Sequence, residues 1–237
     1  MATTTGAGRP RLSTKKRPGD TAREEILDAS AELFTTRGYT STSTRMIADA
    51  VGLRQASLYH HFAGKDDILD ALLGGTVDEP LAVGRGVAES DASAAVKMYA
   101  LVLFDADQLA RSTWNLGALY LLPELRADRF DAFRQHRYAL MNIYASLASA
   151  TASELGVDAL PGTEELPFRL VETVVNGRAD AENGRGVPAV EYAKTIADAA
   201  VRVLGWVGPT DTLRTEAVRL LDCSAAVETV WTARLPS

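Results

Sequence analysis

Apolar residues recur along this chain at intervals of three and four positions, and alternating runs of β-branched residues are scarce. This spacing places apolar side chains on one face of a helix, whereas a half-buried strand requires strict alternation. Alanine and leucine, which both favour helix, are abundant. The sequence therefore predicts an all-α fold.

The N-terminal part of the chain predicts four helices joined by short turns. Gly38 and Gly52 are expected to end the first two, because glycine readily adopts the positive φ of a helix terminus. Thr42 or Ser43 can cap the start of the second helix. The expected helices cover about 20–37, 43–52, 53–62 and the residues from Asp66 onward.

The helical pattern fails in the segment "LLGGTVDEPLAVGRG", residues 72–86, because glycines and Pro80 interrupt it. We expect a domain boundary there, between a smaller domain over 20–73 and a larger one over 74–237. Residues 1–19 are rich in Thr, Gly, Pro and basic side chains, so we expect them to form a disordered basic arm.

The larger domain predicts further helices by the same spacing, with the loop "GVDALPG" between two of them. Pro188 suits the first turn of one helix, and Thr210 or Asp211 suits the start of the last. The expected helices cover about 92–111, a short segment ending near Pro123, 126–155, 163–182, 188–204 and one or two segments after 210.

The formal net charge of −6 argues against a protein that coats nucleic acid without selection. Up to Leu72, however, ten Lys or Arg residues stand against nine Asp or Glu residues, which gives +1 and leaves −7 for the remainder. A basic end on an acidic body fits a phosphate-contacting module joined to a module that does not contact phosphates. A solvated basic tail without a partner explains the charge equally well.

The chain has one cysteine, Cys223, so it cannot form an intramolecular disulfide. No apolar run approaches the roughly 20 residues that a membrane span needs. The segment "MATTTGAGRPRLSTKKRPGD" also lacks the apolar core of a signal peptide. We therefore expect a cytoplasmic protein without a membrane partner.

The segment "TRMIADAVGLRQASLYHHF", residues 44–62, meets the requirements of a helix-turn-helix. Ala48 is small where two crossed helices approach most closely, and Gly52 suits the tight turn. The second helix needs few apolar contacts, so its remaining side chains point outward, as a helix in the major groove requires. The apolar contacts are Ile47, Val51, Leu53 and Leu58, and the outward side chains are Arg54, Gln55, Ala56, Ser57, Tyr59 and His60.

Residues Arg23 to Leu73 resemble the tetracycline-repressor (TetR) family of bacterial regulators, above all in "AELFTTRGYTSTSTRMIADAVGLRQASLYHHFAGKDDILDALL". The order of Tyr59, His61, Phe62 and Lys65 makes the resemblance highly specific. It implies an N-terminal helix-turn-helix DNA-binding domain over 20–73 and a larger effector-binding and dimerisation domain over 74–237.

The resemblance also implies roles for single residues. Arg45 and Gln55 would contact bases, and the chemistry agrees, because arginine pairs bidentately with guanine and glutamine with adenine. Tyr59, His61 and Lys65 would hold phosphates, Thr44 and Ser57 would assist, and Ala56 stands where some members carry proline. The implied DNA-contacting residues are Thr44, Arg45, Arg54, Gln55, Ala56, Ser57, Tyr59, His60, His61 and Lys65.

Adjacent histidines on a helix face different directions, so His60 and His61 are not expected to share a metal, and no cofactor is expected.

Aromatic residues gather in "STWNLGALYLLPEL" and "RFDAFRQHRYALMNIY" of the larger domain. For any single one of them, ordinary core is the commoner explanation. For the region as a whole, polar residues favour a small-molecule cavity, because Asp105 and Gln108 interrupt an apolar helix and His136 follows Phe133 at helical spacing. The expected site for an apolar or aromatic effector consists of Asp105, Gln108, Trp114, Tyr120, Phe133, His136, Tyr144 and Asn176.

The helix from Pro188 carries an apolar stripe with small residues that permit close approach, and the helix over 163–182 offers a second apolar face. Either could complete the core of one chain. The resemblance implies that the two helices instead meet their copies in a symmetric homodimer interface. The expected interface residues are Leu170, Val174, Ala193, Ile196, Ala197, Ala200 and Leu204.

Together these features favour a homodimeric repressor that a small molecule releases from a palindromic operator in double-stranded DNA. An activator, or a ligand-independent regulator of the same fold, is an open alternative. An all-helical enzyme would have to use Cys223, His136 or the pair Asp105 and Asp107. The enzyme alternative is weak, because the sequence shows no nucleophile and base pair, phosphate loop or metal-ligand cluster.

Overall fold

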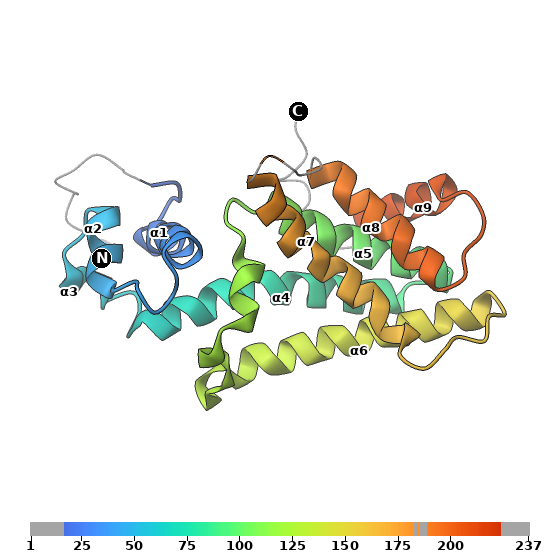
Figure 1. Cartoon of the computed structure of the whole chain (residues 1–237), viewed down its shortest axis with the longest axis horizontal. Coiled ribbons are helices and arrows are strands. Elements are labelled where there is room, and N and C mark those ends of the chain that lie inside the picture. The colour runs from blue at the N-terminus through green and yellow to red at the C-terminus, as the bar shows by residue number, and fades with distance from the viewer. Residues whose placement is uncertain (1–16, 183, 185–188, 224–237) are drawn as a thin grey trace, which may run out of the picture. The chain divides into compact units, whose positions relative to one another are not determined.

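The computed structural model describes residues 17–182, 184 and 189–223 (Figure 1). Every regular element in these ranges is a helix, so the predicted all-α class is confirmed. Contacts between Cα atoms divide the chain into two compact units, Met1–Leu69 and Asp70–Ser237. Helix α4 begins in the first unit and continues into the second.

The smaller unit contains α1 (Ala22–Thr36), α2 (Thr44–Val51), α3 (Gln55–Leu58) and the start of α4. Ser43 caps α2 by accepting a hydrogen bond from the backbone N–H of Met46 at 3.2 Å, which agrees with the predicted start. Thr42, the other candidate, is buried and donates to the carbonyl oxygen of Gly38 at 2.9 Å. Gly52 ends α2 in the left-handed conformation, with φ of 76°.

The predicted interruption over residues 72–86 is wrong, because α4 (Lys65–Glu89) runs through it without a break. Pro80 has no N–H for the carbonyl oxygen of Thr76, four residues earlier, and such a loss normally breaks a helix. Here the side chain of Gln108 supplies the missing donor, since its Nε2 lies 2.9 Å from that oxygen. The helix continues because a neighbouring helix replaces the lost hydrogen bond.

In the larger unit, α5 (Ala94–Arg111) is the central helix, and α6, α7, α8 and α9 all pack on it (Figure 1). Every side chain from Ala95 to Leu109 except Lys97 is buried. Tyr99 of α5 donates to Asp198 of α8 at 2.8 Å and accepts from Arg214 of α9 at 3.0 Å. This cluster ties the three helices together, and burial raises the pKa of Tyr99 to about 12.

The remaining helices follow the predicted order with shifted ends. The segment before α6 folds as three short 3-10 helices, so α6 starts five residues later than expected. Pro188 and any helix after residue 223 lie outside the described residues. The bounds are η1 (Leu116–Leu121), η2 (Pro123–Arg126), η3 (Asp128–Phe130), α6 (Asp131–Glu154), η4 (Thr163–Glu165), α7 (Leu166–Glu182), α8 (Ala189–Val203) and α9 (Asp211–Asp222).

Among the residues that the structure describes, no helix is long and apolar enough to cross a membrane. The same residues contain no group of three or more His, Cys, Asp or Glu side chains placed to hold a metal ion.

Candidate functional site

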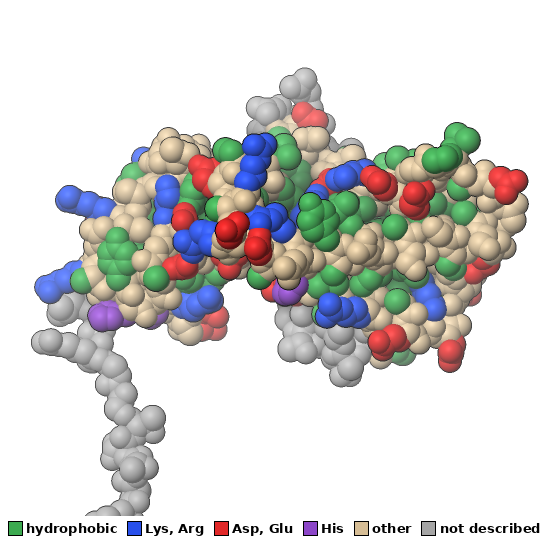
Figure 2. Space-filling view, turned by 90° about the horizontal axis from the view of Figure 1, so that it is seen from below, with side chains coloured by type: hydrophobic (Ala, Val, Ile, Leu, Met, Phe, Trp, Pro, Cys, Tyr) green, Lys and Arg blue, Asp and Glu red, His purple; other side chains and the backbone are tan. Residues whose placement is uncertain are grey.

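Helices α2 and α3 form the predicted helix-turn-helix in the smaller unit. Ile47, Ala48 and Leu58 are buried between them, and the tight turn at Gly52 joins the two helices. The expected DNA-contacting side chains are exposed or half-buried, and basic groups lie at the surface of the smaller unit (Figure 2). The exposed members are Arg45, Arg54, Gln55, Ala56, Tyr59, His60 and His61, and the half-buried members are Thr44, Ser57 and Lys65.

Three of these side chains form a hydrogen-bonded group on the exposed side. Gln55 donates from Nε2 to Thr44 Oγ1 at 3.0 Å, and the Tyr59 hydroxyl lies 3.1 Å from the same oxygen. The group joins the N-terminus of α2 to α3, which is only four residues long. Because the bonds restrict the rotamer of Gln55, less conformational entropy is lost when its amide meets a partner.

Arg45 and Lys65 differ in their freedom to meet a phosphate or a base. The Arg45 side chain is 80% exposed, and its only ion pair among the described residues is a 4.0 Å approach to Asp49. Lys65 is half-buried, donates to the carbonyl oxygen of Tyr39 at 2.8 Å and lies 4.1 Å from the centre of the Tyr39 ring. Lys65 therefore also stabilises the smaller unit itself.

In the larger unit, the expected effector residues divide into two groups. Asp105, Gln108 and Tyr144 are buried and bonded together, because Gln108 donates to Asp105 at 3.1 Å and Tyr144 donates to it at 3.0 Å. Tyr120 extends this network by donating to the hydroxyl of Thr76 at 2.7 Å. The buried Phe133 ring lies 5.9 Å from the ring of Tyr120.

Burial in this network changes the acidity of Asp105. Loss of water around the carboxyl raises its pKa from 3.8 to about 6, although the hydrogen bonds from Gln108 and Tyr144 oppose the rise. The same desolvation raises the pKa values of Tyr120 and Tyr144 above their ordinary range. The two phenols therefore stay protonated and act as hydrogen-bond donors at neutral pH.

His136 and Asn176, which were also expected at the effector site, do not join this network. Both are exposed, and His136 pairs instead with Asp78 of α4 at 2.7 Å. A step of three residues turns a helix by about 300°, which leaves His136 about 60° from the buried Phe133. That rotation is enough to bring it to the surface. Trp114 is half-exposed and lies just before η1.

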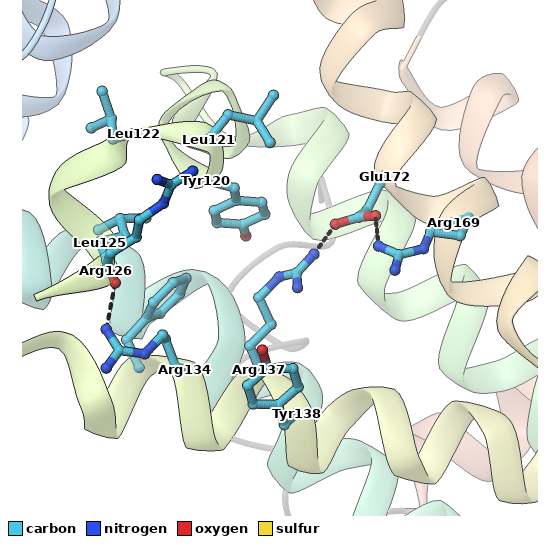
Figure 3. A pocket seen from close by; sticks show the side chains of 11 residues that line it. Tyr120, Leu121, Leu122, Leu125, Arg126, Arg134, Arg137, Tyr138, Arg169 and Glu172 are labelled. Atoms are coloured by element: carbon cyan, nitrogen blue, oxygen red, sulfur yellow. Dashed lines mark hydrogen bonds and ion pairs between the residues drawn. The ribbon is translucent and has the colours of Figure 1, made fainter. Parts of the chain in front are cut away.

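A cavity of about 420 Å³ opens beside Tyr120 and Phe133, between η1, η2, α6 and α7 (Figure 3). Of the expected effector residues, only these two line it. The charged lining of the cavity was not predicted from the sequence, although Arg134 and Arg137 flank the apolar positions of "RFDAFRQHRYAL" at helical spacing. The missed charged residues are Arg126, Arg134, Arg137, Arg169 and Glu172.

Comparison with known proteins agrees with the helix-turn-helix and extends over most of the chain. Residues 26–72 match the model for bacterial regulatory proteins of the tetR family. The crystal structure of AmtR from Mycobacterium smegmatis is 56% identical, with a TM-score of 0.82, over 88% of this chain and 98% of that one. The chain belongs to the TetR family.

Two further comparisons show a lower identity than AmtR does. The HTH-type transcriptional repressor KstR2 of Mycobacterium tuberculosis is 38% identical over 81 residues, which are 34% of this chain and 40% of KstR2. The chain thus matches less than half the length of that curated relative. The structure of FadR from Bacillus subtilis in complex with stearoyl-CoA shares the fold alone, with 20% identity and a TM-score of 0.56 over 75% of this chain and 97% of FadR. Since the family consists of regulatory proteins, the enzyme alternative is set aside.

In this TetR-family chain, most of the expected interface residues are buried within a single chain. The stripe on α8 packs on α5, and Ala193, Ala197 and Ala200 have no exposed surface. Side chains without exposed surface cannot contact a second chain, so the stripe completes the core of one chain, as the sequence also allowed. Val174, Ile196 and Leu204 are buried in the same way, and Leu170 is half-exposed.

Proposed function

We propose that this chain is a homodimeric transcriptional repressor, which binds a palindromic operator and releases it when a small molecule enters the larger domain. The observation that carries the proposal is the exposed side of α2 and α3. Ile47 and Leu58 hold the two helices together from within, while Gln55, Thr44 and Tyr59 present linked polar groups outward. Such a surface suits base edges and phosphates.

The proposed division of work follows the two parts of the chain. Residues 20–73 would bind DNA, residues 74–237 would bind the effector and pair the subunits, and the basic arm over 1–19 would approach DNA. Of the arm the structure describes only residues 17–19, where Arg17 forms ion pairs with Asp28 and Glu32 of α1. The protein would work in the cytoplasm, where operator DNA is accessible.

Pairing of two subunits follows from the small size of the reading surface. Helix α3 has four residues, so one copy offers few contacts to base edges. Two copies spaced by about 34–36 Å, or a multiple of that distance, would read two half-sites of a palindrome. The outer faces of α7 and α8 are candidates for the interface, because positions such as Ala199 keep part of their surface exposed.

The cavity beside Tyr120 and Phe133 is the proposed effector site, and Tyr120 connects it to α4. The Tyr120 hydroxyl donates to Thr76 of α4, the helix whose first residue is Lys65 in the DNA-binding domain. A ligand can release DNA only if it binds more tightly to a form that fits the operator poorly, and each tenfold preference is worth about 1.4 kcal/mol. A ligand that displaces Tyr120 would favour such a form.

Selection of bound duplexes from random DNA, with the full chain at physiological salt, tests the proposal. We expect enrichment of one palindrome, and we expect Gln55→Ala to relax the preference at one position of each half-site. Arg85→Ala is the matched control, since Arg85 is exposed on the part of α4 that belongs to the larger unit. Binding without sequence preference, or enrichment of a single unpaired half-site, contradicts the proposal.

Repression is favoured over activation by the similarity to KstR2, which is named a transcriptional repressor. A reporter placed behind the selected operator distinguishes the two. Removal of the gene should raise reporter expression, and a fall would show an activator.

A further inference from the structure

The wall of the cavity carries an excess of positive charge. Four arginines line it, Arg126, Arg134, Arg137 and Arg169, and Glu172 is the one carboxylate in its lining. This leaves three positive charges in the wall of a space of about 420 Å³. On the face of the larger unit that Figure 2 shows, by contrast, basic and acidic side chains are interspersed. The positive excess in the cavity wall therefore differs from the mixed charge of that face.

The arginines are engaged to different degrees. Glu172 is shared by two of them, since Arg137 pairs with one carboxylate oxygen and Arg169 donates to the other at 2.9 Å (Figure 3). Arg134 pairs with Asp131 and donates to the carbonyl oxygens of Leu125 and Ala127, so it braces the start of α6. Arg126 has no hydrogen-bond or ion-pair partner among the described residues.

Arg126 is therefore the guanidinium group best placed to receive an anion. In the view of Figure 3, Arg126 and Arg137 lie on opposite sides of the Tyr120 ring, and Arg137 is paired with Glu172. The Arg137 guanidinium is 5.6 Å from the centre of that ring and 5.1 Å from the centre of the Phe168 ring. These contacts hold the Arg137 guanidinium in place, and guanidinium groups bind carboxylate, sulfonate or phosphate oxygens in a fixed geometry.

The rest of the lining is apolar and partly uncovered. Tyr120, Phe133 and Leu125 form one part of the wall, while Leu121 is 91% exposed and Tyr138 is 60% exposed. Large apolar side chains with so much exposed surface suit a ligand that covers them. The volume also falls within the range of about 300–1,000 Å³ that is usual for small-molecule sites.

We propose that the effector of this site is an organic acid, with its anionic group at Arg126 and an apolar or aromatic body against Tyr120, Phe133 and Leu121. A cation would be repelled by the arginines, and a neutral apolar compound would cover Arg126 without giving it a partner, which is costly. The assignment of this cavity to the effector rests on the proposed function. The preference of the cavity for anions does not.

The test compares two dyes of the same ring system, 1-anilinonaphthalene-8-sulfonate, which is anionic, and N-phenyl-1-naphthylamine, which lacks the sulfonate. Each is titrated into the full chain and followed by fluorescence. We expect the anionic dye to bind one site per chain about tenfold more tightly than the neutral dye, as one charge-assisted contact allows. Added salt should reduce this difference.

Three variants test the charges directly. Arg126→Gln should weaken the anionic dye about five- to tenfold, and Glu172→Gln should tighten it, because it removes the carboxylate that occupies Arg137 and Arg169. Arg85→Gln, which changes an exposed arginine outside the cavity, should change neither affinity. The neutral dye should bind all variants within about twofold, which reports that the cavity is intact.

Equal affinity for the two dyes overturns the proposal, and so does an Arg126→Gln variant that behaves like Arg85→Gln. Binding of neither dye also counts against it. DNA binding is measured separately on the same samples. If the full chain binds no palindromic operator but still prefers the anionic dye, the proposed regulatory function is refuted and the proposed anion site is not.

Discussion

The side chain of Gln108 donates a hydrogen bond to the carbonyl oxygen of Thr76, the backbone group that Pro80 leaves without its helical donor. The same Thr76 accepts a second hydrogen bond, at its hydroxyl, from Tyr120 in the cavity wall. Helix α4 is therefore held at one residue by a side chain of α5 and by a side chain of η1. Pro80 makes the donor from Gln108 necessary. With another residue at position 80, the backbone N–H of that residue would already donate to the Thr76 carbonyl oxygen.

The first prediction concerns the hydrogen bond that the Gln108 side chain donates in place of a backbone N–H at position 80. Gln108→Met keeps the length of the side chain but leaves the buried Thr76 carbonyl without a donor, so it should cost about 1–3 kcal/mol of unfolding free energy. In a Pro80→Ala background the alanine N–H can bond Thr76, and the same substitution should cost less. Chemical denaturation of the two single variants and the double variant gives the coupling energy.

Gln108 also donates to Asp105, so Gln108→Met should keep part of its cost in both backgrounds. Equal costs with and without Pro80 would show that the Gln108 contact is independent of the proline.

A second prediction concerns pH and the buried Asp105. Its pKa is raised from 3.8 to about 6 by burial, so the folded protein binds this proton more tightly than the unfolded chain does. The contribution of Asp105 to stability is therefore complete below about pH 4 and is lost as the pH rises through about 6. Relative to the unmodified chain, the unfolding free energy of Asp105→Asn should rise by about 2 kcal/mol between pH 4.5 and 7.5.

Unfolding free energies of both proteins at the two pH values check this prediction. If the two proteins differ in unfolding free energy by the same amount at both pH values, the Asp105 carboxyl titrates alike in the folded and unfolded chains.

The elements that the sequence predicted well are those whose causes lie close together in the chain. Ser43 caps α2 three residues before the N–H it accepts from, and Gly52 ends the same helix by its own backbone conformation. The run of α4 through Pro80 could not be predicted in this way, because the replacing donor, Gln108, is 28 residues further along the chain.

The candidate site shows the same limit. The surface position of the expected DNA-contacting side chains follows from helical spacing, whereas the cavity depends on how η1, α6 and α7 pack, which brings Arg126, Arg137 and Glu172 to one wall. The stripe on α8 was ambiguous for another reason. Small apolar residues permit close approach to a helix of the same chain or of another, and the sequence pattern is identical in the two cases.

A third prediction concerns the link from the cavity to α4. Tyr120→Phe removes the hydroxyl that bonds Thr76 but keeps the ring beside Phe133. We expect the affinity of the cavity for the anionic dye to change less than about twofold and the free energy of unfolding to fall by about 1 kcal/mol. If an effector acts by displacing this hydroxyl, the variant should bind operator more weakly even without ligand, and ligand should have a smaller further effect.

Tyr138→Phe is the matched control, since Tyr138 lines the same cavity and is largely exposed. DNA binding by the two variants, with and without ligand, is measured by fluorescence anisotropy. Identical responses of both variants would place the link to DNA elsewhere.

A fourth prediction uses two neighbouring residues of α8. Ala200 has no exposed surface, so Ala200→Arg should disrupt folding, because the core would have to accept a large charged side chain. Ala199 is half-exposed, so Ala199→Arg should leave the fold intact. If the outer face of α8 pairs the subunits, Ala199→Arg should also produce folded monomers with weakened operator binding. Circular dichroism and sedimentation distinguish these results, and a dimer unaffected by Ala199→Arg would move the interface away from this face.

The last prediction distinguishes a residue expected to contact bases, Arg45, from a residue expected to contact phosphates, Lys65. Arg45 is exposed with little intramolecular engagement, whereas Lys65 also bonds the Tyr39 carbonyl, so Lys65→Ala should lower stability by about 1 kcal/mol in addition to weakening DNA binding.

Lys65→Ala should lower the affinity for all DNA sequences by a similar factor, and it should reduce the slope of log affinity against log salt concentration by about one unit. Arg45→Ala should instead cost about 1–3 kcal/mol of binding free energy on the preferred sequence and much less on others, because a bidentate contact to guanine is lost only where the DNA has guanine.

Thr44→Val tests the support of Gln55, since it removes the oxygen that accepts from Gln55 and contacts Tyr59 while keeping the side-chain shape. We expect it to reduce discrimination at the Gln55 position with less effect than Gln55→Ala. Titrations of the selected operator and of a scrambled duplex at several salt concentrations check all three variants, and a uniform loss from Arg45→Ala on both duplexes would assign that arginine to the phosphates.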